Sequence, residues 1–205
     1  MPEATSRASL KTGRSPVYAA EGMVATSQPL AAGAALEILR EGGSAADAAV
    51  CAASMLNVVE PQSTGIGGDM FMLYWDAGEK ELFGLNGSGR APRRATPERY
   101  REAGFETVPE QGIFSVTVPG AVDGWAAALE RFGSDMGLAK VLAPAIRYAE
   151  KGYPVSPIIA SAWKGQEPKL RDFENSARVY LPAGRAVRAG EIFRNPELAA
   201  SLRLV

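Results

Sequence analysis

The sequence predicts an α+β fold in which helices cover antiparallel strands. Two apolar segments, residues 70–75 and 81–86, are separated by turn-forming residues 76–79, and this pattern is typical of a hairpin. The Ala-rich segment that precedes them has no charge between Asp47 and Glu60, which is typical of a helix buried on every side. A chain of 205 residues can bury roughly 70% of its unfolded surface, enough for a core.

The first two helices are predicted from their ends. Ser27 is placed to cap a helix that has Pro29 in its first turn and stops at residues 42–43, both glycine. Ser44 then opens a second helix, and Asp47 follows at the spacing of a capping box. We expect this second helix to run to Glu60 and to lie in the core.

The remaining elements follow in order along the chain. A second glycine-rich loop occupies residues 87–92. The pattern then predicts a short helix from Thr96 to about residue 103, a strand over 114–118, helices over 121–132 and 138–151, and a mainly helical region from residue 158 onward.

Charge and composition exclude several classes of partner. The net charge is −1 and the basic residues are scattered, so neither nucleic acid nor an anionic membrane is expected as a partner. The first 16 residues are polar, and we expect them to be a flexible terminus ahead of a single unit over 17–205. No segment is typical of a signal peptide or a membrane span, which predicts a cytoplasmic protein.

Histidine is absent from the sequence, and there is one cysteine, Cys51. Ser–His and Cys–His catalytic pairs, histidine metal sites and thiolate clusters are therefore excluded within this chain. Since Cys51 lies in the Ala-rich helix, it is interpreted as a small buried apolar side chain.

The loop between the buried helix and the first strand is the candidate site. Glycines there permit positive φ or a close approach to the backbone, which predicts a pocket wall. An alternative is a turn that serves packing only. A phosphate cradle is disfavoured, because dinucleotide and P-loop fingerprints follow a strand and open a helix. The pocket-loop residues are Ser63, Thr64, Gly65, Gly67, Gly68 and Asp69.

These motifs resemble the gamma-glutamyltranspeptidase family. Residues 42–49 (GGSAADAA) and 59–68 (VEPQSTGIGG) are similar to that family's GGNAVDAAVA and VVEPHSSGIGGG patterns. Further similar segments follow collinearly at 89–93, 115–122 and 195–199. The resemblance covers about residues 20–203 and corresponds to the N-terminal part of the large subunit.

The resemblance implies an Ntn hydrolase with an αββα sandwich, of which residues 17–205 would form an incomplete domain, the N-terminal portion of the large subunit. In that family a precursor cleaves itself, and the N-terminal Thr of the small subunit becomes the nucleophile, with its own α-amino group as base. No metal or organic cofactor is implied. None of the threonines in this chain matches the cleavage position, so we assign no catalytic residue here and expect no catalysis by these residues alone.

Substrate recognition is the point at which this sequence departs from the family pattern. Transpeptidases carry D-x-R-E-x-A-P, whose Arg grips a glutamyl carboxylate; alignment places Ser88 at that Arg and Arg90 two residues later. In an extended segment the two side chains would share a side, so Arg90 is a candidate carboxylate ligand, with a solvated surface Arg as the alternative.

The resemblance is strongest to the signal-less cytoplasmic branch. The expected function is gamma-glutamyl transfer or hydrolysis with a small subunit from the same precursor. An amidohydrolase or acylase for another small acid amide, such as oxamate, is the first alternative. A non-catalytic remnant that only binds ligands is the second.

Overall fold

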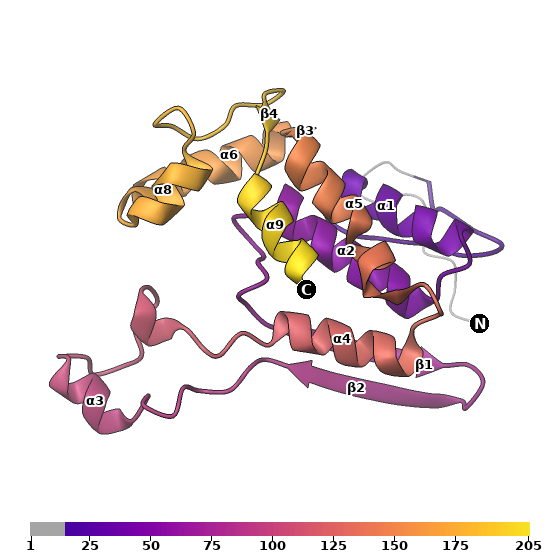
Figure 1. The fold of residues 1–205 in the computed structure, drawn as a ribbon, viewed down its shortest axis with the longest axis horizontal. Helices are drawn as coiled ribbons and strands as arrows, with labels where there is room; N and C mark the ends of the chain where they lie inside the picture. Colours follow the sequence, from indigo (N-terminus) through magenta and orange to yellow (C-terminus); the bar gives the residue numbers. More distant parts are fainter. Residues whose placement is uncertain (1–14) are drawn as a thin grey trace.

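A computed structural model describes residues 15–205 and shows a group of helices lying against a two-stranded sheet (Figure 1). The helices are α1 (Pro29–Arg40), α2 (Ala45–Val59), α3 (Pro97–Glu102), α4 (Ala121–Phe132), α5 (Gly137–Lys151), α6 (Pro157–Gly165), α7 (Glu167–Arg171), α8 (Glu174–Tyr180) and α9 (Pro196–Leu204), and the strands are β1 (Met70–Asp76), β2 (Glu81–Gly87), β3 (Tyr153–Pro154) and β4 (Ile192–Phe193). The terminus predicted to be flexible, residues 1–16, lies almost wholly outside the described residues.

Helix α2 is the centre of the core and packs against α1, α4 and α5. Its predicted capping box is confirmed: the Ser44 backbone N–H donates to Asp47 Oδ2 at 2.7 Å, and the Asp47 N–H donates to Ser44 Oγ at 3.1 Å. Cys51 and Met55 are fully buried. Small side chains along the helix allow its neighbours to approach closely, and the prediction of a core helix is correct. The helix is not buried on every side, because Ala45 and Ala49 are exposed and Leu56 is half-buried.

Helix α1 begins one residue later than the sequence suggested. Gln28, and not Ser27, is the N-cap, and its side-chain Oε1 accepts the Leu30 N–H at 2.8 Å. Gln28 is buried, and its side-chain amide makes the capping hydrogen bond that was expected from the shorter Ser27 hydroxyl. The C-terminal end is as predicted, because Gly42 has φ +90°, a conformation that glycine adopts without strain.

The predicted hairpin is confirmed. Strands β1 and β2 pair antiparallel, with Met70 opposite Gly87 and Asp76 opposite Glu81. Asp76 sets the turn, since its Oδ1 accepts the N–H groups of Gly78 at 2.8 Å and Glu79 at 3.0 Å. Helix α4 runs along one face of this sheet (Figure 1).

That inner face is held by aromatic packing. Tyr74 stacks on Phe132 with ring centroids 4.1 Å apart, and Phe83 lies 5.3 Å from the same ring. The opposite face has no cover among the described residues. It exposes Phe71, Leu73, Trp75 and Leu82.

The strand predicted over residues 114–118 does not form. A short 3-10 turn occupies Ile113–Ser115, and the following residues are irregular, with the Val118 N–H donating to the Arg90 carbonyl at 2.9 Å. Strand propensity needs a partner to pair with, and no described segment pairs with these residues. Residues 88–119 instead extend away from the helices as an arm that carries α3 (Figure 1).

The C-terminal region is mainly helical, as predicted, with a short antiparallel pair between β3 and β4. Tyr153 anchors this pair to the core, because its hydroxyl donates to the Val58 carbonyl of α2 at 2.9 Å. Helix α9 packs on α5. Among the helices of residues 15–205, none has the length and apolar character that a membrane crossing requires.

Candidate functional site

The predicted pocket loop lies between α2 and β1 and is shaped by its own backbone. The Glu60 carbonyl accepts the N–H groups of Ser63 at 2.9 Å and Thr64 at 3.2 Å, which turns the chain out of α2. The Gly68 N–H then donates to the Gly65 carbonyl at 3.0 Å. All six predicted loop residues are exposed.

The loop glycines do not serve the positive φ that the sequence allowed. None of them is among the glycines with positive φ. A Cβ on Gly65 or Gly67 would meet nothing within 4 Å, so the backbone there borders open space. The geometry therefore agrees with the other expectation, that another group can approach the loop backbone closely.

A hollow of about 420 Å³ lies beside the loop. Five of the six predicted residues line it, and Gly67 does not. The lining residues of the loop are Ser63, Thr64, Gly65, Gly68 and Asp69, and the other side is formed by α2 and α4. The structure therefore brings this part of the prediction together at one concave surface.

A junction of bare backbone joins the loop to the two segments that carry the other motifs. The Gly68 carbonyl accepts the N–H groups of Gly120 at 3.0 Å and Ala121 at 3.1 Å, at the start of α4. A Cβ on Gly120 would lie 2.3 Å from the Gly87 carbonyl oxygen, and one on Gly89 would lie 1.9 Å from the Val118 carbonyl oxygen. Only glycine permits these approaches.

Ser88 and Arg90 lie outside the loop hollow. The Ser88 hydroxyl donates to the Gly89 carbonyl at 3.3 Å, and the Ser88 N–H donates to Asn86 Oδ1 at 3.0 Å. Arg90 is exposed, and no carboxylate of the described residues lies within 4.0 Å of its guanidinium. Its backbone carbonyl, by contrast, is held by Val118.

The expectation that Ser88 and Arg90 share one side depended on an extended segment. Strand β2 ends at Gly87, and Gly89 has φ +76°. A residue in the left-handed region interrupts the two-residue alternation of a strand, so that reasoning does not apply to these two side chains. The structure thus positions the backbone of this segment against the loop's neighbour, Gly120, but leaves the Arg90 side chain in solvent.

Asn57 is a residue of the hollow that the sequence analysis did not select. It is 6% exposed, its Nδ2 donates to the Ala53 carbonyl at 2.8 Å, and its Oδ1 is buried without a hydrogen-bond partner. A buried acceptor without a hydrogen bond costs about 1–3 kcal/mol of folding free energy, so a hydrogen-bond donor at this position would be favourable. The only signal in the sequence is a single amide in an otherwise apolar turn of α2.

The one thiol and the buried carboxylate of the core have structural roles. Burial, with a small contribution from Glu37, raises the pKa of Cys51 to about 12, so it is a neutral thiol and not a nucleophile at neutral pH. Burial alone would raise the pKa of Asp47, but hydrogen bonds from Ser134 and Ser44 outweigh it and hold that pKa below 3.8. Within the described residues no cluster of three His, Cys, Asp or Glu side chains could hold a metal ion.

Comparison with known proteins identifies the family. The profile of the family described as Gamma-glutamyltranspeptidase matches residues 31–205. The chain is 34% identical over 191 residues to the glutathione hydrolase proenzyme of Bacillus subtilis (strain 168), covering 90% of this chain and 32% of that protein. It is 40% identical over 189 residues to the oxamate amidohydrolase proenzyme of Klebsiella pneumoniae, covering 90% of this chain and 35% of that protein.

Solved structures show the same fold. A cephalosporin acylase from Bacillus halodurans matches with a TM-score of 0.89 and 47% identity, covering 93% of this chain and 36% of that one. The Helicobacter pylori gamma-glutamyltranspeptidase matches with a TM-score of 0.85 and 30% identity, covering 92% of this chain and 55% of that one. The fold prediction, the large-subunit portion of an α+β Ntn hydrolase, is confirmed.

The curated relatives are longer than this sequence, which spans about a third of their length. The collinear motifs, the match over residues 31–205 and the shared fold lead to one conclusion. The chain belongs to the gamma-glutamyltranspeptidase family, and it corresponds to the N-terminal part of that family's large subunit.

Proposed function

We propose that this chain is part of an enzyme that cleaves gamma-glutamyl amides and passes the acyl group to water or an amine. The observation that carries the proposal is the backbone junction of Gly68, Gly89 and Gly120, which joins three of the five family-like segments, 59–68, 89–93 and 115–122, beside a hollow of about 420 Å³. A substrate amide could lie against the exposed backbone of Gly65 and Gly68 in this wall.

The nucleophile in this proposal is an N-terminal Thr from sequence outside these residues, on a small subunit of the same precursor. Its hydroxyl oxygen attacks the amide carbon, its α-amino group takes the hydroxyl proton, and the amine leaves with that proton. Water or an amine then attacks the resulting ester and releases the Thr. The residues described here provide the loop wall, and Arg90, which lies outside the hollow in this structure, is the candidate cation for the substrate carboxylate.

A second candidate substrate is the amide of a smaller acid, such as oxamate. Ser88 stands where transpeptidases carry their carboxylate-binding Arg, and the similarity to an oxamate amidohydrolase proenzyme reaches 40% identity. A shorter acid would need its carboxylate ligand at a different place, and Arg90 is the nearest cation in sequence. An acylase activity belongs to the same candidate class, since a cephalosporin acylase is among the similar structures.

Substrate turnover by the full polypeptide that the gene encodes tests both candidates. The protein is incubated with a gamma-glutamyl anilide and, separately, with oxamate, and the products are identified by mass spectrometry. Release of the aniline supports the first candidate, and release of ammonia from oxamate supports the second. If neither compound is cleaved, both substrate proposals are wrong.

Arg90 is tested in the same assay. Replacing it by Gln should raise KM by roughly tenfold or more, because a charge-assisted hydrogen bond to the carboxylate is lost, while kcat changes little. Arg93→Gln is the matched control on an exposed neighbour. An unchanged KM for Arg90→Gln would leave Arg90 as a solvated surface residue.

A non-catalytic role as a ligand-binding remnant makes a different prediction about the gene. An in-frame continuation with a Thr at the family's cleavage position supports the enzyme, and a stop codon without a second subunit supports the remnant. We also propose that the protein acts in the cytoplasm, which cell fractionation tests directly.

A further inference from the structure

A second hollow lies on the other side of the loop, away from the proposed substrate pocket. Its volume is about 320 Å³, and it is formed between the start of the loop and helices α6, α7 and α8. Pro61 borders both hollows, so the chain from α2 separates them. The side chains that line it are Gln62, Trp163, Gln166, Lys169, Leu170, Phe173, Ser176 and Tyr180.

One wall of this hollow is a fixed aromatic cluster. Trp163 is 1% exposed, and its indole N–H donates to the Tyr180 carbonyl at 2.9 Å. Its ring meets Phe193 edge to face with centroids 4.7 Å apart, and Tyr180 lies 6.0 Å away. These contacts fix the rings in place behind the hollow, and the apolar surface that a ligand can reach is that of half-buried Leu170 and of Phe173, which is 42% exposed.

Gln62 supplies an acceptor without a donor. Its Oε1 is buried and makes no hydrogen bond, and the residue lines the hollow. Buried polar atoms in proteins are nearly always paired, so an N–H or O–H from a ligand would remove a standing cost.

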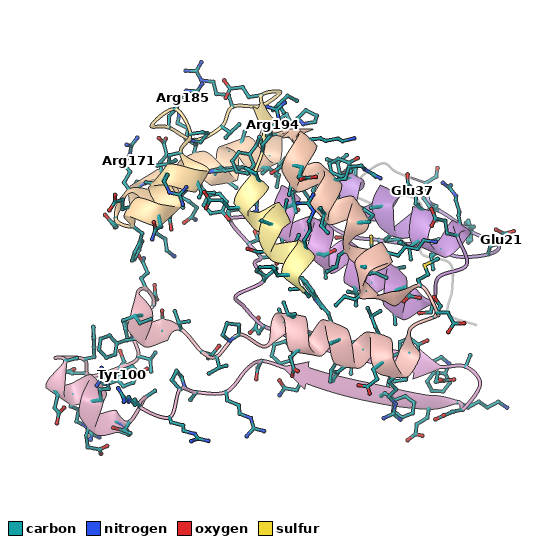
Figure 2. The ribbon with its side chains drawn as sticks, viewed as in Figure 1. Glu21, Glu37, Tyr100, Arg171, Arg185 and Arg194 are labelled. Atoms are coloured by element: carbon teal, nitrogen blue, oxygen red, sulfur yellow. The ribbon has the colours of Figure 1, made fainter. Side chains whose placement is uncertain are left out.

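Lys169 supplies a cation without an anion. No carboxylate of residues 15–205 lies within 4.0 Å of its ammonium group. Its neighbour Arg171, which is labelled in Figure 2, differs because its guanidinium already donates to Glu167 Oε1 at 3.1 Å and to the Gly184 carbonyl. The available charge at this hollow is therefore that of Lys169.

We propose that this hollow binds a small carboxylate that carries an aromatic ring and an amide N–H. The ring would pack on Leu170 and Phe173, the N–H would donate to Gln62 Oε1, and the carboxylate would pair with Lys169. This site is separate from the proposed substrate pocket and carries no chemistry of its own. Since Gln62 is the residue before Ser63, occupancy would also fix the start of the pocket loop.

Equilibrium binding of hippurate to the full polypeptide tests the proposal, because hippurate joins a phenyl ring, an amide N–H and a carboxylate. Titration followed by protein-observed NMR gives the dissociation constant. N-benzoylsarcosine, which lacks the N–H, should bind roughly fivefold more weakly, the loss expected for one uncharged hydrogen bond. N-benzoylglycinamide, which lacks the charge, should also bind more weakly.

Two variants assign the contacts. Gln62→Met should weaken hippurate roughly fivefold and leave N-benzoylsarcosine unchanged, with Gln111→Met as the matched control. Lys169→Gln should weaken hippurate and leave N-benzoylglycinamide unchanged, with Lys164→Gln as the control. This pairing of probe and variant separates a lost contact from a general loss of folding.

Three outcomes would overturn the proposal. Hippurate could fail to bind, it could bind both variants as tightly as the wild-type protein, or the hollow could prove to be filled by another segment of the full polypeptide. The assay measures binding and not turnover. A protein that cleaves amides but ignores hippurate contradicts only this inference, and one that binds hippurate at Gln62 without amidase activity contradicts only the proposed function.

Discussion

The helical region around α2 and the β1–β2 hairpin use apolar side chains in opposite ways. The large apolar residues of α2 are buried except for Leu56, which is half-buried beside the hollow, and Met55 is 0% exposed. The hairpin buries one face against α4 but leaves Leu73 78% and Trp75 60% exposed on the other. The helices thus form a core that the described residues complete, whereas the sheet is only half covered by them.

This difference predicts which substitutions change the free energy of unfolding. A side chain in a complete core is surrounded by fixed neighbours, so its loss leaves a cavity. A side chain on an uncovered face is in contact with water in both the folded and the unfolded state. It therefore contributes little to the free energy of unfolding. Four substitutions, taken from the largest expected effect to the smallest, test this distinction.

Met55→Ala should lower the free energy of unfolding by about 3 kcal/mol, because it removes a fully buried side chain and leaves a cavity. Urea denaturation followed by circular dichroism measures the change. A loss below about 1 kcal/mol would mean that the region around α2 is loosely packed and that the contrast with the hairpin is wrong.

Gly89→Ala should lower the free energy of unfolding by about 2 kcal/mol or more. The new Cβ would lie 1.9 Å from the Val118 carbonyl oxygen, and the φ of +76° adds strain of about 1 kcal/mol. Gly104→Ala is the matched control, because Gly104 has φ +84° but no atom within 4 Å of the added Cβ. Equal losses in the two variants would show that the backbone junction tolerates displacement.

Asp47→Ala should cost about 1–2 kcal/mol at neutral pH, since it leaves the Ser44 and Ser134 N–H groups without their acceptor. The folded-state pKa of Asp47 is lowered, so its stabilisation is present above the unfolded pKa and is lost as pH falls through the folded value. Denaturation curves from pH 7 to pH 2 should therefore converge for the two proteins below about pH 4. Parallel curves would refute the linkage.

Leu73→Ser should change the free energy of unfolding by no more than about 0.5 kcal/mol, because the side chain is already in water. The same variant should reduce self-association of the 205-residue chain, which size-exclusion chromatography measures. A large destabilisation would mean that another part of the protein covers this face.

Local signals predicted most of the helices and the hairpin. Ser44 and Asp47 fix the start of α2 by themselves, and the uncharged run after them determines burial. The strand expected over residues 114–118 failed because pairing depends on a distant partner, which the segment itself does not reveal. The cap at Gln28 was missed for a related reason, since its role depends on being buried.

The site was predictable only in part. The loop residues could be selected from their glycines, and the structure places five of them on one hollow. The contact of Gly89 with Val118 and the unpaired Asn57 Oδ1 both arise from the tertiary fold, so no local sequence pattern predicts them. Whether Ser88 and Arg90 bind substrate stays a prediction.

The hydrogen bonds from Gly120 and Ala121 to the Gly68 carbonyl join the pocket loop to the start of α4. The first turn of α4 holds the loop, and the last turn of α4 holds the hairpin through Phe132. The same helix therefore positions both the pocket wall and the hairpin, and we expect a displacement of α4 to move the two together.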